Sequence, residues 1–233
     1  SCLQQIKTSD SSNDKSFLTS KRYLKVDVNG RVYTNVTNIK KEERKFLLAD
    51  NKNLVEIDIE NSQPYFLLLL FFLKASHPPG SYTNVETFTP ETTKYACLVS
   101  NGELYQFFAD YLGVGQAEAK RRVFIDIFFG KSYYRSRSRN LFEKEFPEIL
   151  NFIDHIKKRN YKNLARELQL IESEFIINRV ISSYRKLTND AFVATIHDAL
   201  LVKPENADAA MRVITNELSI AGITPRIQVK QCN

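Results

Sequence analysis

The stretch LVEIDIENSQPYFLLLLFFL, Leu54–Leu73, joins a row of carboxylates to the most apolar run in the chain. If its first part is a strand, Glu56, Asp58 and Glu60 share one face and the apolar residues between them share the other. Like charges on one short face repel each other unless cations lie opposite them. We expect Glu56 and Glu60 to be solvated or paired with nearby cations.

The apolar run that follows predicts a buried helix. Pro64 is suited to the first turn of a helix, and the nine residues Tyr65–Leu73 are all apolar, which carries the helix to about Lys74. This run is far shorter than the roughly 20 residues that a membrane-spanning helix needs, so we expect no membrane segment. With 233 residues, 43% of them hydrophobic, and with 7 Gly and 7 Pro, the composition is that of a globular chain with a real core.

The distribution of charge indicates a polyanionic partner more strongly than the total does. The net charge is +6 and the sequence pI is about 9.1, values also common in proteins without such a partner. The window Lys120–Arg166, however, contains 13 Lys and Arg against 5 Asp and Glu, a net charge of +8. Tyr133, Tyr134 and Tyr161 are interleaved with these cations. Since cations release phosphate counterions and aromatic rings stack on bases, the window predicts a nucleic-acid surface. A solvated helical face is the simpler alternative.

Cysteine usage is typical of a reducing compartment. Cys2, Cys97 and Cys232 are scattered and form no CxxC pair. An odd, scattered count argues against a disulfide framework or a zinc knuckle. We expect no signal peptide. We therefore expect a cytoplasmic, intracellular protein.

Alternation, helical periodicity and turn residues predict a mixture of helices and strands. The polar residues 1–22 predict a loose lead-in, and the Asn-Gly pair at 29–30 predicts a hairpin. The expected strands are 22–35 (that hairpin), 54–59, 191–204 (a second hairpin) and 224–230. The expected helices are 64–74, 101–112, 116–129, 142–159, 162–186 and 205–222, with a short connector at 40–48 and a loop at 76–93.

Asp58 and Asp198 each lie at the end of an apolar β segment, where an ionised carboxylate needs hydrogen bonds or a cation. If the two segments are adjacent strands, joint ionisation is disfavoured until divalent cations bind. Mg²⁺ takes one or two carboxylates plus substrate phosphates, as in two-metal phosphoryl transfer. Either Asp alone is more often an ordinary strand-end residue. The pair His197–Asp198 is also found in HD-type metal phosphohydrolases, but these need further histidines, and the chain has only His77 and His155 besides.

A basic helix ends directly before a glycine in AKRRVFIDIFFGKSYY, Ala119–Tyr134. Arg121, Ile125 and Phe129 fall at i, i+4 and i+8, along one face of an α-helix. A cation early in such a helix would hold a triphosphate, and the aromatic ring two turns later would pack on a base or sugar. Helices with a basic face are common, so this segment is weak evidence by itself.

The order of these three segments resembles motifs A, B and C of family A DNA polymerases and of the related single-subunit phage-type RNA polymerases. EIDIENSQPYFL is similar to motif A, which implies Asp58 as a metal ligand and the carbonyl oxygen of Ile59 as a second. TIHDALLV is similar to motif C, a hairpin with His-Asp at its tip. The resemblance implies a metal-binding Asp198, with His197 supporting the hairpin or touching the primer strand.

Motif B in these families is a basic residue followed, eight and nine positions later, by an aromatic-glycine pair. Arg121 fits that position, with Lys120 as an alternative, and the pair is Phe129–Gly130. The resemblance implies that the cations hold the triphosphate and that Phe129 packs on the incoming nucleotide. Gln63, five residues after Asp58, falls where the DNA polymerases use a Glu to exclude the 2′-hydroxyl and the RNA enzymes have Gly, so the sugar preference leans towards deoxyribose.

The flanking segments extend the resemblance over about residues 30–230. GRVYTNVTN is similar to the segment that contacts the primer-template, which implies that role for Arg31. RELQLIES resembles the helix that touches the minor groove near the primer end, with Arg166 and Gln169 as candidates. KPENADAAMRVITNELSIAGITPRIQVK has the helix-then-strand finish of these families.

Several residues depart from the family pattern. Ala199 replaces the Glu that the DNA polymerases have after His-Asp, although the phage-type RNA polymerases have a small residue there. Phe129 stands where Tyr is usual, which would weaken discrimination between ribose and deoxyribose. The residues before Asp58 are too few for a full thumb and a proofreading exonuclease, so we expect a stripped-down or truncated enzyme.

Together these features predict an α+β polymerase fold, a right-hand palm of antiparallel sheet backed by helices with a helical fingers insertion. We expect a polar lead-in at 1–22, the palm at 23–74 and 164–233, and the fingers at 75–163. The expected function is template-directed DNA polymerisation with two Mg²⁺ ions, or Mn²⁺ in their place. The expected partners are primer-template DNA, nucleoside triphosphates and a protein that supplies a thumb or processivity. The alternatives are RNA polymerase or primase activity, untemplated end-addition, and a non-catalytic nucleic-acid-binding protein with a polymerase-like fold.

Overall fold

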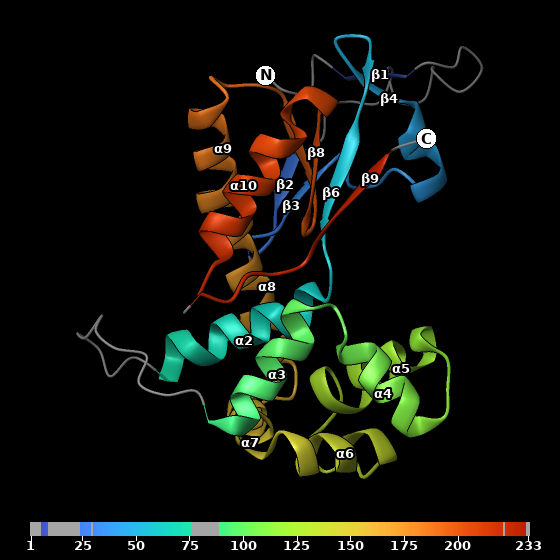
Figure 1. Cartoon of the computed structure of the whole chain (residues 1–233), viewed down its shortest axis with the longest axis vertical. Coiled ribbons are helices and arrows are strands. Elements are labelled where there is room, and N and C mark those ends of the chain that lie inside the picture. Colours follow the sequence, from blue (N-terminus) through green and yellow to red (C-terminus); the bar gives the residue numbers. More distant parts are fainter. Residues whose placement is uncertain (1–5, 9–23, 29, 76–88, 221, 232–233) are drawn as a thin grey trace. The chain divides into compact units, whose positions relative to one another are not determined.

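The computed structural model describes residues 6–8, 24–28, 30–75, 89–220 and 222–231 (Figure 1). The chain forms two compact units and passes from the first to the second and back twice. Unit 1 is Ser1–Ile59, Glu172–Leu218 and Ile227–Asn233, and unit 2 is Glu60–Ile171 and Ser219–Arg226. Helices combined with antiparallel sheets confirm the predicted α+β class.

A four-stranded antiparallel sheet forms the centre of unit 1, with the strand order β7-β8-β6-β9. The strand β6 lies between β8 and β9, and both of these come from the C-terminal part of the sequence (Figure 1). The register pairs Ile57 with Leu200 on β8 and Asp58 with Gln228 on β9. The strands are β6 (Val55–Ile59), β7 (Val193–Ile196), β8 (Ala199–Val202) and β9 (Ile227–Gln231).

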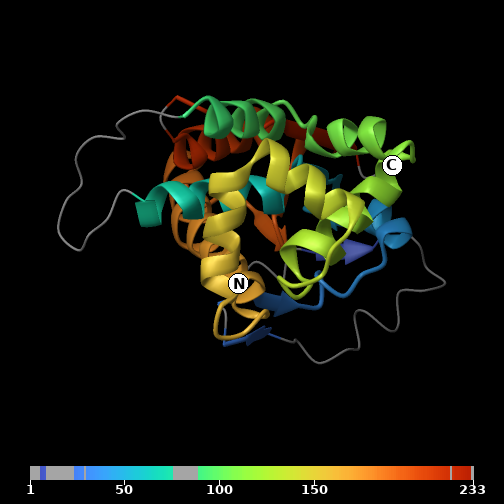
Figure 2. The same cartoon turned by 90° about the horizontal axis from the view of Figure 1, so that it is seen from below.

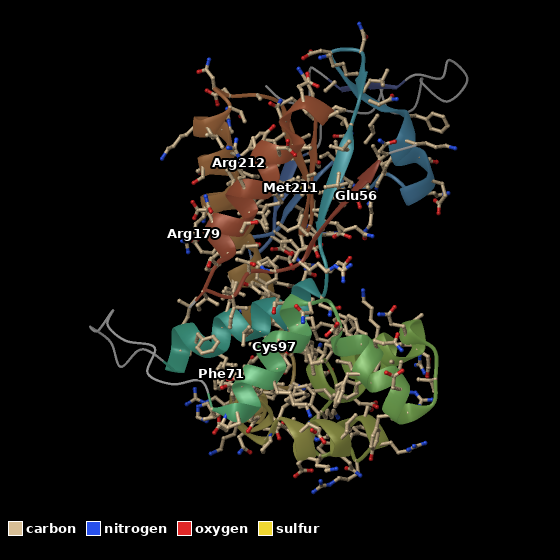
Figure 3. All side chains as sticks on the ribbon, viewed as in Figure 1. Glu56, Phe71, Cys97, Arg179, Met211 and Arg212 are labelled. Atoms are coloured by element: carbon tan, nitrogen blue, oxygen red, sulfur yellow. The ribbon has the colours of Figure 1, made fainter. Side chains whose placement is uncertain are left out.

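The alternation in β6 has the predicted effect on burial. Val55, Ile57 and Ile59 are buried, whereas Asp58 is only partly buried. Glu56 is also buried, on β6 in the middle of the sheet (Figure 3). Opposite Glu56 in the register, Leu201 joins a hydrophobic cluster with Val36, Leu47, Ala49, Leu54, Phe192 and Ile196. The face of β6 that has the acids is therefore covered in part by the N-terminal segment.

Two small antiparallel sheets precede β6 in the chain. The strands β2 (Leu24–Val26) and β3 (Val32–Thr34) form the hairpin predicted from the Asn-Gly pair. The 3₁₀-helix η2 (Lys41–Phe46) leads into β4 (Leu47–Ala49), which pairs with β5 (Lys52–Asn53) and with β1 (Ile6–Thr8).

The strand β1 corrects the prediction of a loose lead-in. Polar composition does not exclude a strand where β4 offers an unpaired backbone edge, because the pairing uses main-chain groups of any residue. Residues 1–5 and 9–22 of the expected lead-in lie outside the described part of the chain.

Helices of unit 1 pack beside its sheet. The α-helix α8 (Asn163–Ser173), which belongs to unit 2 as far as Ile171, continues through the π-helix η4 (Glu174–Val180) into α9 (Ile181–Leu187), close to the single helix predicted for 162–186. After the short η5 (Pro204–Asn206), α10 (Ala207–Leu218) contacts β6, β8 and η4. Arg179 of η4 donates a hydrogen bond of 3.1 Å to Glu217 of α10, and Figure 3 labels Arg179 together with Met211 and Arg212 of α10.

Unit 2 is helical, and among its described residues the only β pairing is an isolated bridge between Ile220 and Ile223. Its core is rich in aromatic rings: Tyr95, Phe142 and Phe146 pack edge to face, with centroids 5.1–6.0 Å apart. No helix in the described part of the chain is both long and apolar enough to cross a membrane. The helices, besides α8, are α2 (Ser62–Ala75), α3 (Pro90–Ser100), α4 (Leu104–Leu112), α5 (Gln116–Arg122), the π-helix η3 (Val123–Phe128), α6 (Arg137–Glu145) and α7 (Pro147–Lys157) (Figures 1 and 2).

Two predicted elements of unit 2 are wrong in detail. The helix expected at 142–159 is two helices, because a residue before proline avoids the α region, and Phe146 before Pro147 has φ −140° and ψ 54°. The loop expected at 76–93 is helical from Pro90 onwards, since the Thr89 side chain accepts a hydrogen bond from the Thr92 N–H at 3.2 Å and so caps α3. Residues 76–88 of that loop lie outside the described residues.

The unit boundaries differ from the predicted division at 74/75 and 163/164. Unit 1 is left after Ile59 and entered again at Glu172. The helix α2 belongs to the helical unit because its contacts are there: Tyr95 donates a hydrogen bond to the Pro64 carbonyl oxygen at 3.2 Å, and the Phe71 ring packs on Phe152. Assigning the units as palm and fingers stays a prediction.

Candidate functional site

Asp58 lies on β6, and Asp198 lies directly before the neighbouring strand β8, at the same end of the sheet in unit 1. The last β6–β8 pair is Ile57 with Leu200, so Asp58 is the next residue of β6. Asp198 directly precedes β8, which begins at Ala199. From the sequence, the two acids are expected at the same end of a sheet only if their two β segments are adjacent strands. The β6–β8 register shows that these segments do pair.

His197 and Asp198 are the whole connection between β7 and β8, because Ile196 pairs with Ala199. Two-residue connections of this kind need positive φ, and His197 has φ 56°, a conformation that costs a non-glycine residue some strain. The ring of His197 packs edge to face on Tyr33, with centroids 6.3 Å apart. Tyr33 and the tight turn thus restrain the position of Asp198.

Charged neighbours tune His197. The pKa of its ring is lowered, first because nearby protein atoms remove part of its hydration and next because of the positive charges of Arg31 and Arg44. The carboxylate of Asp198 acts in the opposite direction. His197 therefore favours the neutral form, whose ring can donate one hydrogen bond and accept another.

The three acids of the opening stretch have different partners. Glu56 accepts a hydrogen bond of 3.0 Å from Arg44, in a pair that is largely buried. Glu60, in unit 2, lies 3.4 Å from Arg226. The prediction that these two acids pair with nearby cations is thereby confirmed.

Lys230 of β9 forms an ion pair with Asp58. Sequence reasoning missed this residue, which is 172 positions away and is a single lysine in the last strand. Only the β6–β9 register, which places Lys230 opposite Glu56 and Gln228 opposite Asp58, brings its side chain to the same face as the two acids.

The donor set at this end of the sheet fits a hard divalent cation of the Mg²⁺ type. Asp58 and Asp198 supply two carboxylates, the number Mg²⁺ commonly takes from a protein when substrate phosphates complete its shell. Asp58 is already paired with Lys230, so a divalent cation at this carboxylate would have to displace the ammonium group. No cluster of three or more His, Cys, Asp or Glu side chains suited to a metal occurs among the described residues. Ile59 ends β6, and its carbonyl oxygen as a ligand stays a prediction.

Arg31 is held by a buried acid that sequence reasoning missed. Its Nε and Nη2 donate hydrogen bonds of 3.2 and 3.0 Å to Glu172, which is 2% exposed. Burial disfavours the charge on Arg31, but the attraction and hydrogen bonds of Glu172 outweigh it and raise the Arg31 pKa. A small pocket is lined by Arg31, Val32, Glu172, Ser173, Ile176, Ile177, Thr195 and His197. Two predicted primer-contacting residues, Arg31 and His197, thus line one pocket.

The basic helix of unit 2 pairs its cations internally. Arg121 donates hydrogen bonds of 2.7 and 2.8 Å to Glu118, and Arg122 donates one of 2.7 Å to the same carboxylate. These two arginines lower the pKa of Glu118 to about 2. The ammonium group of Lys120 lies over the rings of Tyr105 and Phe124.

The helix changes form before the aromatic-glycine pair. From Val123 to Phe128 it is a π-helix, and the Phe129 N–H donates to the Phe124 carbonyl oxygen at 2.8 Å. The prediction that Arg121, Ile125 and Phe129 share one face assumed an α-helix, whose i, i+4 spacing does not apply through this π segment. Phe129 stacks on Phe124 and remains 38% exposed.

Close packing explains the glycine of this pair. A Cβ on Gly130 would lie well inside contact distance of the Ile125 carbonyl oxygen. The buried Lys157 donates hydrogen bonds to the carbonyl oxygens of Gly130, at 2.9 Å, and of Ile127. Lys157 is a further residue that sequence reasoning missed, because a lysine in a charged segment reads as solvated.

A stacked tyrosine pair follows Gly130. The rings of Tyr133 and Tyr134 are 5.4 Å apart and nearly parallel, and they are 71% and 60% exposed. Lys131 lies over the rings of Tyr133 and Tyr161. The predicted interleaving of tyrosines with cations is thus present on the surface of unit 2, and its role with nucleic acid stays a prediction.

The remaining candidates lie on helices of unit 2. Gln63 is in the first turn of α2, and Arg166 and Gln169 are on α8, where Arg166 is exposed. Asp58, Asp198, His197 and Arg31 thus all belong to unit 1, where Arg31 and His197 line one pocket. The structure describes Gln63, Lys120, Arg121, Phe129, Gly130, Arg166 and Gln169 in unit 2.

No family model and no curated protein matches the chain. Among solved structures, the chain is similar to the POL domain of Pol1 from M. smegmatis, in complex with DNA primer-template and dNTP. The two are 12% identical with a TM-score of 0.47, and the match covers 89% of this chain and 46% of that one. This chain thus spans about half the length of that solved chain. The function proposed below is argued from the residues of this chain and not from that likeness.

Proposed function

We propose that the chain is a nucleotidyltransferase that extends a 3′-hydroxyl on a DNA template by two-metal phosphoryl transfer. The observation that carries the proposal is the pairing of β6 with β8, which places Asp58 and Asp198 at the same end of adjacent strands. The resemblance of the three segments to polymerase motifs A, B and C supports the same reaction.

The two carboxylates would hold the metal ions, Mg²⁺ or Mn²⁺, together with the carbonyl oxygen of Ile59. When bound, such ions lower the pKa of the attacking hydroxyl and stabilise charge on the pyrophosphate leaving group. The short turn that holds Asp198, and the ion pair that holds Asp58, would fix the directions of the carboxylates before substrate arrives. His197 would then touch the primer strand beside them.

The basic helix would bind the nucleotide. Arg121 and Lys120 would supply fixed positive charge to the triphosphate, and Phe129, already exposed and next to Gly130, would pack on the incoming nucleotide. Arg121 would have to exchange Glu118 for phosphate. This exchange is cheap, because exposed ion pairs contribute little stability and phosphate offers more acceptor oxygens. Gln63 would contact the sugar, and Arg31, Arg166 and Gln169 the primer-template.

Primer extension tests the proposal directly. A labelled primer is incubated with the protein and Mg²⁺ or Mn²⁺, first with dNTPs and then with rNTPs, each with and without template. We expect templated extension with dNTPs that Asp198→Asn abolishes. A matched control is Asp190→Asn, which removes an exposed pair with Arg185 in the same unit and keeps a residue suited to its φ of 61°.

Different results select the alternatives. Extension with rNTPs alone favours an RNA polymerase or primase, and extension without template favours end-addition. Extension that survives Asp198→Asn shows that the assigned site is wrong.

The second candidate is a non-catalytic nucleic-acid-binding protein. It is favoured by Ala199, which leaves the His-Asp turn without a further acid, and by Lys230, which already neutralises Asp58. Protein that binds DNA but extends no primer under any of these conditions would establish this candidate and overturn the first.

A further inference from the structure

Each of the two acids of β6 has its own cation. Glu56 is paired with Arg44, which comes from the 3₁₀-helix η2. Asp58 is paired with Lys230, which comes from β9. In the register Lys230 is opposite Glu56 rather than Asp58, so its side chain reaches diagonally along the sheet to the second acid. Arg44 already occupies Glu56, which leaves Asp58 as the acid for Lys230.

The two pairs differ in how easily they open. Arg44 and Glu56 have side-chain exposures of 19% and 11%, so breaking that pair would strand buried charges. Lys230 and Asp58 have exposures of 34% and 25%, and a lysine is a flexible point charge with no fixed geometry. The Arg44 pair is therefore structural, and the Lys230 pair can exchange its partner.

We infer that Lys230 is a built-in counter-ion that occupies Asp58 until a divalent cation displaces it, and so sets the affinity of the site for that cation. The inference rests on the proposed function, because it assigns Asp58 as a metal ligand. Without metal, the ammonium group neutralises the charge of the Asp58 carboxylate. When an ion binds, Lys230 has to move and its charge opposes the incoming one.

This arrangement makes occupancy depend on the nucleotide. A divalent ion arriving alone has to displace Lys230 without a substitute partner for the ammonium group. An ion arriving with a triphosphate brings phosphate oxygens, which both complete its coordination shell and neutralise the displaced lysine. Lys230 thus favours the metal-nucleotide complex over the free metal at this site.

Binding of Mn²⁺ alone to the full chain, measured by electron paramagnetic resonance, tests the inference without any turnover. We expect Lys230→Met to bind Mn²⁺ about threefold to tenfold more tightly than the unaltered protein, because one opposing charge is removed. Lys230→Arg keeps the charge and should remain within about twofold of the unaltered protein. Lys52→Met is the matched control, since it removes an equal charge from an exposed pair with Glu205 in the same unit and should change little.

The outcomes separate the inference from the proposed function. If Mn²⁺ binds, is lost in Asp58→Asn, and is unaffected or weakened by Lys230→Met, Lys230 is not a competing counter-ion and the inference is overturned while the metal site stands. If neither the unaltered protein nor any variant binds Mn²⁺, both the metal site and the inference are overturned. Circular dichroism of each variant verifies the fold, and Lys230→Gln serves if the Met variant does not fold.

Discussion

The ammonium group of Lys157 donates a hydrogen bond of 2.9 Å to the carbonyl oxygen of Gly130, in the interior of unit 2. Burial and the charge of Arg139 lower the Lys157 pKa from 10.5 to about 8, with Asp154 acting in the opposite direction. In the unfolded chain this lysine keeps its ordinary pKa, so the unfolded state binds more protons between pH 8 and 10.5. The destabilisation that comes from burying the charged lysine is therefore complete below about pH 8, and it decreases as the pH rises.

We therefore predict that the free energy of unfolding, relative to Lys157→Met, rises with pH by up to about 1.4 kcal/mol per unit between pH 8 and 10. Urea unfolding of both proteins across this range measures the difference. Lys158→Met, next to it and exposed, is the control and should show no such slope. Parallel pH curves for Lys157→Met and the unaltered protein would contradict the assigned pKa.

Gly130 is predicted to tolerate no side chain. In Gly130→Ala the new Cβ has to push the Ile125 carbonyl oxygen aside, which disturbs the end of the π-helix and the Lys157 contacts. We expect a loss of about 2 kcal/mol or more, in the range of other overpacking changes, measured by thermal or urea unfolding. Gly115→Ser is the control, because that glycine meets open space at the N-cap of α5, where Ser is favoured. Equal stability of the two variants would rule out the steric argument.

Two acids two residues apart on β6 are predicted to respond in opposite ways. Glu56→Gln leaves the buried Arg44 without a charged partner, and Arg44 Nε already lacks a hydrogen-bond partner within the described residues. We expect it to cost about 2–4 kcal/mol of stability. Primer extension, assayed where the variant is folded, should be retained.

Asp58→Asn breaks a more exposed pair and should cost no more than about 1 kcal/mol, yet abolish extension. Urea unfolding measures the expected change in stability, and primer extension on the same preparations measures the expected loss of activity. A stable but inactive Glu56→Gln protein would reverse the assignment of the two acids.

The ring of His197 reports on the charges around the proposed site. Because Arg31 lowers its pKa and Asp198 raises it, Arg31→Met should raise the His197 pKa and Asp198→Asn should lower it further. Nuclear magnetic resonance titration of the histidine ring measures both directions. Arg185→Met removes an exposed arginine of the same unit and should leave the value unchanged. Shifts of equal sign in the first two variants would indicate a structural change instead of a charge effect.

The stacked tyrosines of unit 2 are predicted to bind bases. Replacing Tyr133 and Tyr134 together with Ser should weaken binding of a single-stranded DNA oligonucleotide by about tenfold or more, since even one stacked base contributes roughly 1–3 kcal/mol. The dependence of binding on salt should persist, because no phosphate contact is lost. Fluorescence anisotropy at several salt concentrations measures both quantities. Tyr111→Ser, at another exposed tyrosine on α4, is the control and should bind normally.

Local patterns predicted much of the architecture. The strand β6, the helix α2 and the hairpin around His197–Asp198 follow from alternation, an apolar run and turn residues, all of which act over a few positions. The break at Pro147 was also present in the sequence, as the conformational restriction on Phe146, but was not recognised. The π-helix from Val123 has no comparable local signal, because the same residues would form an α-helix equally well by periodicity.

The sequence did not predict contacts between residues that are far apart in the chain. Lys230 meets Asp58, and Glu172 meets Arg31, across 172 and 141 positions. Each contact depends on which strands and helices pack together, and no spacing rule encodes that choice. Lys157 was missed for a different reason. Its burial depends on hydrogen bonds to two main-chain carbonyl oxygens, and the positions of main-chain groups cannot be read from the sequence.

The strand order β7-β8-β6-β9 has a consequence for synthesis of the protein. During translation, β6 leaves the ribosome long before either of its neighbours, so both of its edges lack partners while residues 60–192 are being made. Unpaired apolar strands are sites of aggregation, and charged residues within them suppress it. Glu56 and Asp58 place like charges on β6 while it is unpaired. We therefore expect these two acids to suppress aggregation of the nascent chain until β8 and β9 have been synthesised.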